Sequence, residues 1–231
     1  MKRLVLTSSF AAIFDPSRDP NDPYTYTSED WSPLTYEQAV STTETITAYR
    51  ASKKLAESEA WNWARSPSGV NANGEKVDLT VFCPPLVFGP WVHPVGSLSS
   101  INTSNQVIGD MILGVRKDSI AATRSSAWVH IGDLALAHVE AAYHRPETGN
   151  KRFAVCSPER FSYQFIAQII KEEFPEWAER VVLPPGSPPP AHGLDGSPLT
   201  TELGVKYTSL RECVVAVVKQ IHGEAVKEGV F

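Results

Sequence analysis

The sequence predicts an α/β fold, with a mainly parallel sheet, flanking helices and a small α-rich C-terminal lobe. Short apolar, β-branched runs alternate along the chain with longer runs that have helical spacing. The run at 3–8 is almost entirely apolar, as is typical of a buried parallel strand. The last third of the chain has mostly helical patterns. This alternation favours strand–helix units over an all-β or all-α fold.

The first half of the chain is expected to carry two strands and one long helix. Residues 3–8 predict a strand, and residues 15–34, rich in Pro, Asp, Ser and Thr, predict an irregular surface loop. A helix is expected from about residue 47 or 49 to about residue 65, because good helix formers fill the pattern there. The run at 77–90 predicts a strand that two prolines stop. Open α/β sheets place ligands beyond such strand ends.

The second half continues the alternation and ends in helices. Asp133 is expected as the N-cap of a helix that ends near residue 144. A Pro-rich rigid linker is expected at 181–198. The other expected elements are a helix at 98–116, strands at 127–131 and 151–157, and helices at 161–174 and 209–229.

Composition excludes several classes of protein. A net charge of -5 and an isoelectric point near 5.7 argue against a nucleic-acid partner. No apolar run approaches the roughly 18 residues of a membrane span, and the start is too quickly polar for a signal peptide, so we expect a cytoplasmic protein without a membrane partner. The three cysteines form no C-x-x-C pair, and the histidines lack ligand spacing, so no metal is expected.

A tyrosine and a lysine stand four residues apart on the first predicted helix. Tyr49 and Lys53 therefore share one face of that helix. A tyrosine, with an ordinary pKa near 10, is a poor acid–base group at neutral pH unless a neighbouring ammonium stabilises its phenolate. Such a pair alone is more often a surface pair. Here the first strand also delivers Ser8 and Ser9 to its carboxyl end, so three polar groups are expected to converge.

Several stretches together resemble the extended short-chain dehydrogenases/reductases of the NAD-dependent epimerase/dehydratase superfamily. Within that family the sequence resembles the branch of dihydroflavonol reductase, cinnamoyl-CoA reductase and yeast methylglyoxal reductase. The stretches that carry the resemblance are VLTSSFAAIFD, AYRASKKLAESEAW, CPPLVFGP, INTSN, VHIGDLALAH and TTELGVKYTSLRE. They are spread over nearly the whole chain.

The resemblance implies a role for each matching residue. It makes Ser9 the group that polarises a substrate carbonyl, Tyr49 the proton donor, and Lys53 the ammonium that stabilises the tyrosine and binds the nicotinamide ribose. The nicotinamide would pack near Pro84 and Val87, and the implied cofactor is NADP(H), with NAD(H) as the alternative. The resemblance adds Ser104 as a cofactor contact and makes Phe10, Ile46 and Leu86 the lining of a pocket for a small hydrophobic carbonyl substrate. Ordinary core packing is the alternative for the last three.

The family's N-terminal dinucleotide-binding half has no counterpart in the sequence, which contains no G-x-G-x-x-G motif. We therefore expect a truncated Rossmann-like fold. Residues 1–90 would form the C-terminal part of the nucleotide-binding domain, and residues 91–231 mainly the substrate lobe, with 127–131 and 132–144 returning to the sheet. The strand at 3–8 would have an open edge, available for self-association or for a partner chain.

Three hypotheses about function remain open from the sequence. The first is an NADP(H)-dependent carbonyl reductase. The second is an inactive truncated homologue that acts as an interaction module or as half of a complemented enzyme. The third is an epimerase or dehydratase relative, which would keep NAD bound throughout its cycle.

Overall fold

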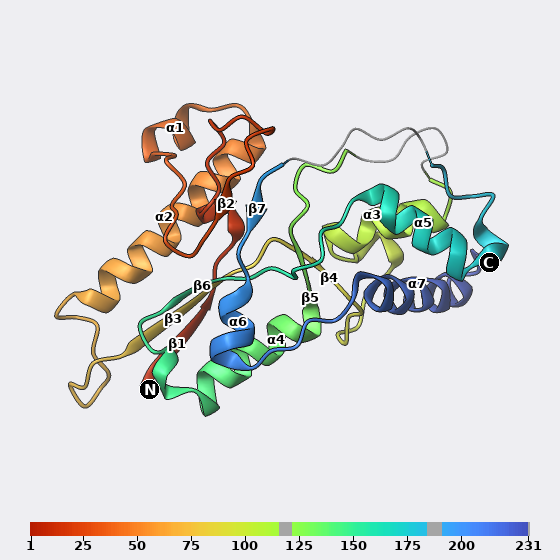
Figure 1. Ribbon diagram of the computed structural model, residues 1–231. Coiled ribbons are helices and arrows are strands. Elements are labelled where there is room, and N and C mark those ends of the chain that lie inside the picture. The colour runs from red at the N-terminus through yellow and green to blue at the C-terminus, as the bar shows by residue number, and fades with distance from the viewer. Residues whose placement is uncertain (116–121, 184–190, 231) are drawn as a thin grey trace.

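A three-stranded parallel sheet forms the centre of the larger body of the protein (Figure 1). The computed structural model describes residues 1–115, 122–183 and 191–230. The strands β1 (Arg3–Thr7), β3 (Asp78–Cys83) and β6 (Arg152–Ala154) lie in the order β1–β3–β6, and all pairings are parallel. The expected α/β fold with a parallel sheet and flanking helices is confirmed.

Helices cover both faces of this sheet. The helix α2 (Thr45–Arg65) packs on one face, where Trp61 and Ala64 join Leu79 and Val81 of β3 in one apolar cluster. The helix α4 (Ile131–Val139) packs on the other face through Leu134 and Ala137, and a π-helical turn continues it. The alternating side chains of each strand thus divide between two cores, which makes three layers.

The long helix α2 forms because its sequence contains no glycine or proline and many good helix formers. It ends at Arg65, and Ser66 caps it in an extended conformation directly before Pro67. A residue before proline avoids the helical region, which explains the stop. Prolines also end β3. Pro84 and Pro85 follow its last residue, and proline has no N–H to donate to a neighbouring strand.

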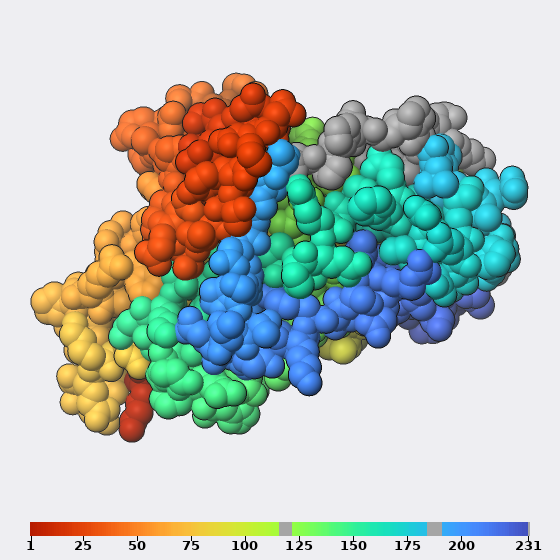
Figure 2. Space-filling model, viewed as in Figure 1, coloured from red at the N-terminus to blue at the C-terminus, as the bar shows by residue number. Residues whose placement is uncertain are grey.

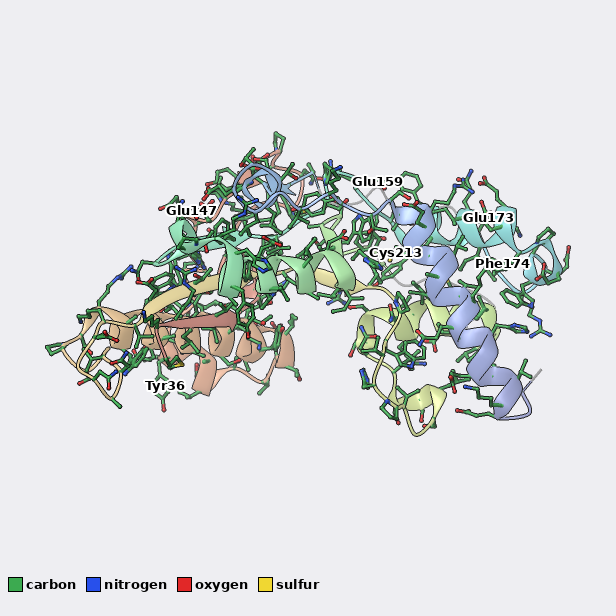
Figure 3. The ribbon with its side chains drawn as sticks, turned by 90° about the horizontal axis from the view of Figure 1, so that it is seen from below. Tyr36, Glu147, Glu159, Glu173, Phe174 and Cys213 are labelled. Carbon is green, nitrogen blue, oxygen red and sulfur yellow. The ribbon has the colours of Figure 1, made fainter. Side chains whose placement is uncertain are left out.

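A helical lobe stands beside the sheet body. The helices α3 (Thr103–Ile112), α5 (Tyr163–Glu173) and α7 (Leu210–Lys227) enclose the largest apolar cluster. Figure 2 shows the N-terminal segments gathered at one end and α5 and α7 at the other. In Figure 3 the same division is visible from below, with Phe174 and Cys213 in the helical lobe and Tyr36 on the other body.

Two short parallel pairs complete the sheet structure. The strand β4 (Leu86–Phe88) pairs with β5 (Trp128–His130), and β2 (Thr25–Tyr26) pairs with β7 (Gly193–Leu194). The strand expected at 127–131 therefore forms, but it pairs with β4 and lies outside the three-stranded sheet. The strand that follows β3 in that sheet is β6. Consecutive strands need not be neighbours, and spacing alone does not set the order.

Several expected boundaries change. The expected helix at 98–116 is a 3-10 turn η2 (Leu98–Ser100) followed by α3, with the end of the expected range outside the described residues. Part of the expected Pro-rich linker, 184–190, also lies outside them, while α6 (Ser197–Leu203) occupies its end. The remaining elements are α1 (Tyr36–Ser41) and the 3-10 turns η1 (Phe10–Ala12), η4 (Pro146–Thr148) and η5 (Pro175–Trp177), together with the π-helical turn η3 (Glu140–His144).

The expectation that Asp133 caps α4 is wrong. The N-cap is His130, whose Nδ1 accepts a hydrogen bond from the Gly132 amide. Asp133 lies in the first turn, where it accepts hydrogen bonds of 2.8 and 2.9 Å from the amide and hydroxyl of Thr208. Its carboxylate therefore ties the segment before α7 to α4. In the part of the chain that the structure describes, no helix is long and apolar enough to span a membrane.

Candidate active site

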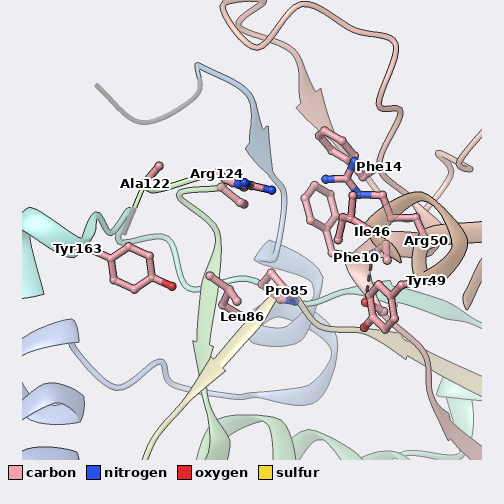
Figure 4. A pocket seen from close by; sticks show the side chains of 13 residues that line it. Phe10, Phe14, Ile46, Tyr49, Arg50, Pro85, Leu86, Ala122, Arg124 and Tyr163 are labelled. Carbon is pink, nitrogen blue, oxygen red and sulfur yellow. Dashed lines mark hydrogen bonds between the residues drawn. The ribbon is translucent and has the colours of Figure 1, made fainter. Parts of the chain in front are cut away.

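A cavity of about 310 Å³ opens beyond the carboxyl end of β1, between the sheet body and the helical lobe (Figure 4). Five of the predicted site residues contribute to its wall: Ser9, Phe10, Ile46, Tyr49 and Leu86. Ser9 and Phe10 come from the turn η1 and its cap after β1, Ile46 and Tyr49 from α2, and Leu86 from β4. The structure thus brings together the serine, the tyrosine and the three residues expected to contact substrate.

Ser9 is held by the turn that follows β1. It has extended backbone angles and is the N-cap of η1, where its Oγ accepts a hydrogen bond of 3.1 Å from the Ala11 amide. The Phe10 amide donates to the Pro84 carbonyl at 2.8 Å, which joins this turn to the end of β3. A hydroxyl that accepts one bond still has its hydrogen to donate. Ser9 can therefore donate a hydrogen bond to an oxygen atom in the cavity.

A buried ion pair fixes the strand end against α2. The Ser8 hydroxyl donates to the Glu57 carboxylate at 2.5 Å, and the Arg152 guanidinium donates to the same carboxylate at 2.6 Å. Both charged side chains are almost fully buried. Trp61 Nε1 donates a further bond of 3.2 Å. Because Glu57 lies on the same helix as Tyr49, this network fixes the position of the tyrosine helix relative to Ser9.

Arg152 extends the network to the loop before α1. Its Nη1 donates to the carbonyls of Ser28 and Asp30, and its guanidinium lies 3.8 Å from the centre of the Trp31 ring. The buried cation thus satisfies carbonyl groups of a loop that has little regular structure of its own. Sequence reasoning missed this residue, because a single arginine in a strand gives no local signal.

Tyr49 and Lys53 occupy one face of α2, as their spacing predicts. The Lys53 Nζ lies 5.9 Å from the centre of the Tyr49 ring. Tyr49 is 46% exposed, and Lys53 is half-buried. Tyr49 therefore contacts both the cavity and the solvent, which leaves its hydroxyl accessible to a ligand.

The other predicted cofactor contacts do not line the cavity. Val87 lies in the middle of β4, Pro84 is buried at the end of β3, and Ser104 is the second residue of α3. The neighbour of Ser104, Asn105, has a clear structural role: its Nδ2 donates to the Gly89 carbonyl at 2.7 Å. The INTSN stretch thus fixes α3 to the end of β4.

Sequence reasoning missed several other residues of the cavity wall. Phe14 packs edge-on against Phe10 with ring centres 5.6 Å apart. Arg50 follows Tyr49 on α2, and its guanidinium lies 4.5 Å from the centre of the Phe14 ring. The remaining unpredicted residues of the wall are Ala11, Ala122, Arg124, Ser125 and Tyr163, while Pro85, which also lines it, belongs to the loop expected beside the nicotinamide. Arg50 could have been considered from the sequence, because it directly follows the predicted proton donor Tyr49.

The described residues fit only one end of a nicotinamide dinucleotide. Tyr49 lines the cavity, and the Lys53 ammonium lies beside the Tyr49 ring without lining the cavity itself; by the family resemblance these two groups would hold the nicotinamide ribose. The sequence has no glycine-rich turn that would hold the pyrophosphate. Within 1–115, 122–183 and 191–230, no three His, Cys, Asp or Glu side chains gather in the way that a metal ion requires.

Comparison with known proteins relates the chain to reductases. It is 36% identical over 220 residues to the ketoreductase azaE of Aspergillus niger, covering 93% of this chain and 60% of the relative. It is 31% identical over 227 residues to the NADPH-dependent methylglyoxal reductase GRE2 of Saccharomyces cerevisiae, covering 96% of this chain and 64% of the relative. The chain thus spans less than two thirds of the length of both relatives. No protein-family model matches it.

Solved structures give the same relationship. Gre2 from Candida albicans superposes with a TM-score of 0.82 at 28% identity, covering 97% of this chain and 66% of that chain. Yeast methylglyoxal/isovaleraldehyde reductase Gre2, complexed with NADPH, superposes with a TM-score of 0.81 at 27% identity, covering 100% of this chain and 65% of that chain. These relatives and the shared fold confirm the resemblance to the extended short-chain dehydrogenases/reductases, in the branch of the methylglyoxal and cinnamoyl-CoA reductases.

Proposed function

We propose that the chain carries the catalytic half of an NADP(H)-dependent carbonyl reductase. The observation that carries this proposal is the meeting of Ser9 and Tyr49 at one cavity, with Lys53 beside the tyrosine ring. The reductases GRE2 and azaE, which share about a third of its residues, support the reaction class. The substrate is a small ketone or aldehyde.

The residues of the chain divide the work at the carbonyl group. Ser9 donates a hydrogen bond to the carbonyl oxygen and polarises it. Tyr49 then gives its hydroxyl proton to that oxygen as the alcohol forms, and Lys53 stabilises the phenolate that remains. A bound nicotinamide cofactor would supply the hydride that the carbonyl carbon accepts. Phe10, Ile46 and Leu86 contact the apolar part of the substrate.

NADP(H) is the proposed cofactor because the GRE2 relative is named for NADPH and its solved counterpart contains NADPH. Tyr49 and Lys53 would hold the nicotinamide ribose, and the bend at Pro84 and Val87 would lie beside the ring. Among the described residues, we assign none to binding of the adenine and phosphate groups. Affinity should therefore be low unless another polypeptide segment supplies those contacts.

The test is whether the full chain reduces a small ketone or aldehyde with NADPH. The rate is measured as the loss of NADPH absorbance. Tyr49→Phe should lower the rate at least about 100-fold, because it removes the proton donor. Tyr36→Phe is the matched control, since Tyr36 lies exposed on α1, away from the cavity, and should leave the rate unchanged. Equal rates in the wild type and Tyr49→Phe would contradict the proposal. A nucleotide that copurifies tightly would favour the epimerase alternative.

A second candidate function is association through the edge of the sheet. β1 pairs only with β3 in the described sheet. The Lys2 carbonyl and the Ser8 amide bond to β3, so the alternation along the strand turns the peptide groups of Val5 and Thr7 to the open side. Such a row of free groups can pair with another strand. This edge is a site for self-association or for a complementing chain.

Val5→Pro tests the edge, because it removes an outward N–H without removing a bond to β3. Light scattering after gel filtration should give a higher mass for the wild type than for the variant. The control, Thr25→Pro, places the same change in β2, away from this edge. A monomeric wild type would contradict self-association, though not pairing with a different chain.

A further inference from the structure

Two arginines line the cavity that also contains Ser9 and Tyr49. Arg50 comes from α2, directly after Tyr49, and Arg124 comes from the segment before β5. In Figure 4 the Arg124 side chain points across the cavity toward the side where Arg50 lies over Phe14. Two positive groups therefore share one end of a cavity whose other wall residues include several apolar side chains.

Neither guanidinium has an acidic partner in the described parts of the chain. The ion pairs formed there involve other arginines, such as Arg152 with Glu57 and Arg211 with Glu172. Arg50 instead packs on the face of the Phe14 ring. An arginine that serves only structure is usually paired or placed in solvent. Arg50 is half-buried and unpaired, which suits a ligand-binding role.

The two charges also oppose each other. Burial, together with the charge of Arg124, lowers the pKa of the Arg50 guanidinium. Arg50 is half-buried and Arg124 is exposed. Two like charges at one cavity repel each other, and an anion between them is attracted by both. The guanidinium fork matches a carboxylate with two parallel hydrogen bonds. A carboxylate that entered this part of the cavity could therefore pair with both arginines.

We infer that the cavity binds an oxo acid, a carbonyl compound that also carries a carboxylate, and that Arg50 and Arg124 bind this carboxylate. The inference rests on the proposed function and specifies its substrate class. The carbonyl oxygen lies at Ser9 and Tyr49, and the hydrocarbon part lies against Phe10 and Leu86. This refines the expectation of a small hydrophobic carbonyl substrate, because the apolar residues form only part of the wall.

The test is binding of levulinate and of its methyl ester to the full chain by calorimetry, without nucleotide. The two ligands differ by the negative charge and share the ketone. The wild type should bind levulinate at least about tenfold more tightly than the ester, because a charge-assisted hydrogen bond is stronger than a neutral one. Arg50→Gln combined with Arg124→Gln should abolish this preference, and Arg50→Lys should keep part of it.

Arg65→Gln is the matched control. Arg65 is an exposed arginine of the same helix and lies over Trp61, away from the cavity. It should leave the preference for the acid unchanged. If the wild type binds the acid and the ester equally, binds neither at millimolar concentration, or keeps its preference in the double variant, the inference is overturned.

Failure of this inference is distinguishable from failure of the proposed function. A preference for the acid that depends on both arginines supports the inference even if no carbonyl is reduced. Reduction of the ester that depends on Tyr49, without any preference for the acid, overturns the inference and leaves the reductase standing. The binding data and the turnover data therefore answer separate questions.

Discussion

The Ser8 hydroxyl donates a hydrogen bond of 2.5 Å to the Glu57 carboxylate, which joins the carboxyl end of β1 to α2. Ser8 precedes Ser9 in the chain, and Glu57 lies one helical turn beyond Lys53 on the same helix. This contact thus helps to set the distance between the two elements that carry the proposed catalytic residues. Arg152 neutralises the carboxylate that makes this contact.

Replacing Arg152 by methionine should destabilise the fold strongly. The change leaves Glu57 buried without its cation, which costs about 3–5 kcal/mol for such pairs. Urea denaturation measures the loss. Arg211→Met is the control, because Arg211 forms exposed ion pairs with Glu172 and Glu173, and its loss should cost less than about 1 kcal/mol. Equal losses in the two variants would show that the buried network is not important for stability.

Gly89→Ala should also lower the free energy of unfolding, by about 1–3 kcal/mol. Gly89 has a φ of +132°, and an added Cβ would lie 2.5 Å from Ile131 Cγ2 and 2.9 Å from the His130 ring. The strain would arise at Gly89 itself, whose carbonyl accepts a hydrogen bond from Asn105 Nδ2. Thermal unfolding checks the effect against Gly96→Ala, which meets no atom within 4 Å. A Gly89 variant as stable as the wild type would refute the close approach.

The stability should fall when the pH drops below about 6.5, partly because of His192. Burial, with the charges of Arg160 and Arg50, lowers the pKa of His192 from its ordinary value of 6.5. The unfolded chain then takes up a proton that the folded chain resists, so folding loses stability as the pH falls through this range. His192→Gln should flatten this slope in urea titrations at several pH values. An identical slope in the variant would exclude His192 as a source.

All three cysteines should resist thiol reagents in the folded protein. Burial raises the pKa of Cys83 to about 12, of Cys156 to about 11 and of Cys213 to about 12. The reactive thiolate is therefore scarce at neutral pH, and the sulfur atoms are inaccessible. An aromatic disulfide reagent should label no cysteine in buffer and all three in urea. Fast labelling of any of them in buffer would contradict the packing around that thiol.

Much of the fold follows from the sequence, because apolar runs and helix formers act locally. The strands at β1 and β3 and the helices α2, α5 and α7 appear close to where the patterns predict them. The pairing of β5 with β4 was not predictable, since spacing along the chain does not choose a neighbour. The cap of α4 was misassigned because Asp133 instead bonds Thr208, which is distant in sequence.

The candidate site was predictable where it depends on helix geometry. Tyr49 and Lys53 share a face because of their spacing, and the apolar run of β1 places Ser9 at its end. Arg124 gave no signal, because it stands in a segment without periodicity. Its relation to Arg50 arises only in the folded chain, where both residues line one cavity. Val87 and Ser104 do not line the cavity, and their proposed cofactor contacts stay predictions.

Binding of nucleotide fragments tests most directly whether this chain retains the nicotinamide half of a cofactor site. The full chain is titrated by calorimetry with NADPH, with reduced nicotinamide mononucleotide and with the adenosine half of NADPH. The proposal predicts that NADPH and the nicotinamide fragment bind with similar affinity, that Lys53→Ala weakens both, and that the adenosine half does not bind. Binding of the adenosine half alone, or affinities that Lys53→Ala leaves unchanged, would contradict it.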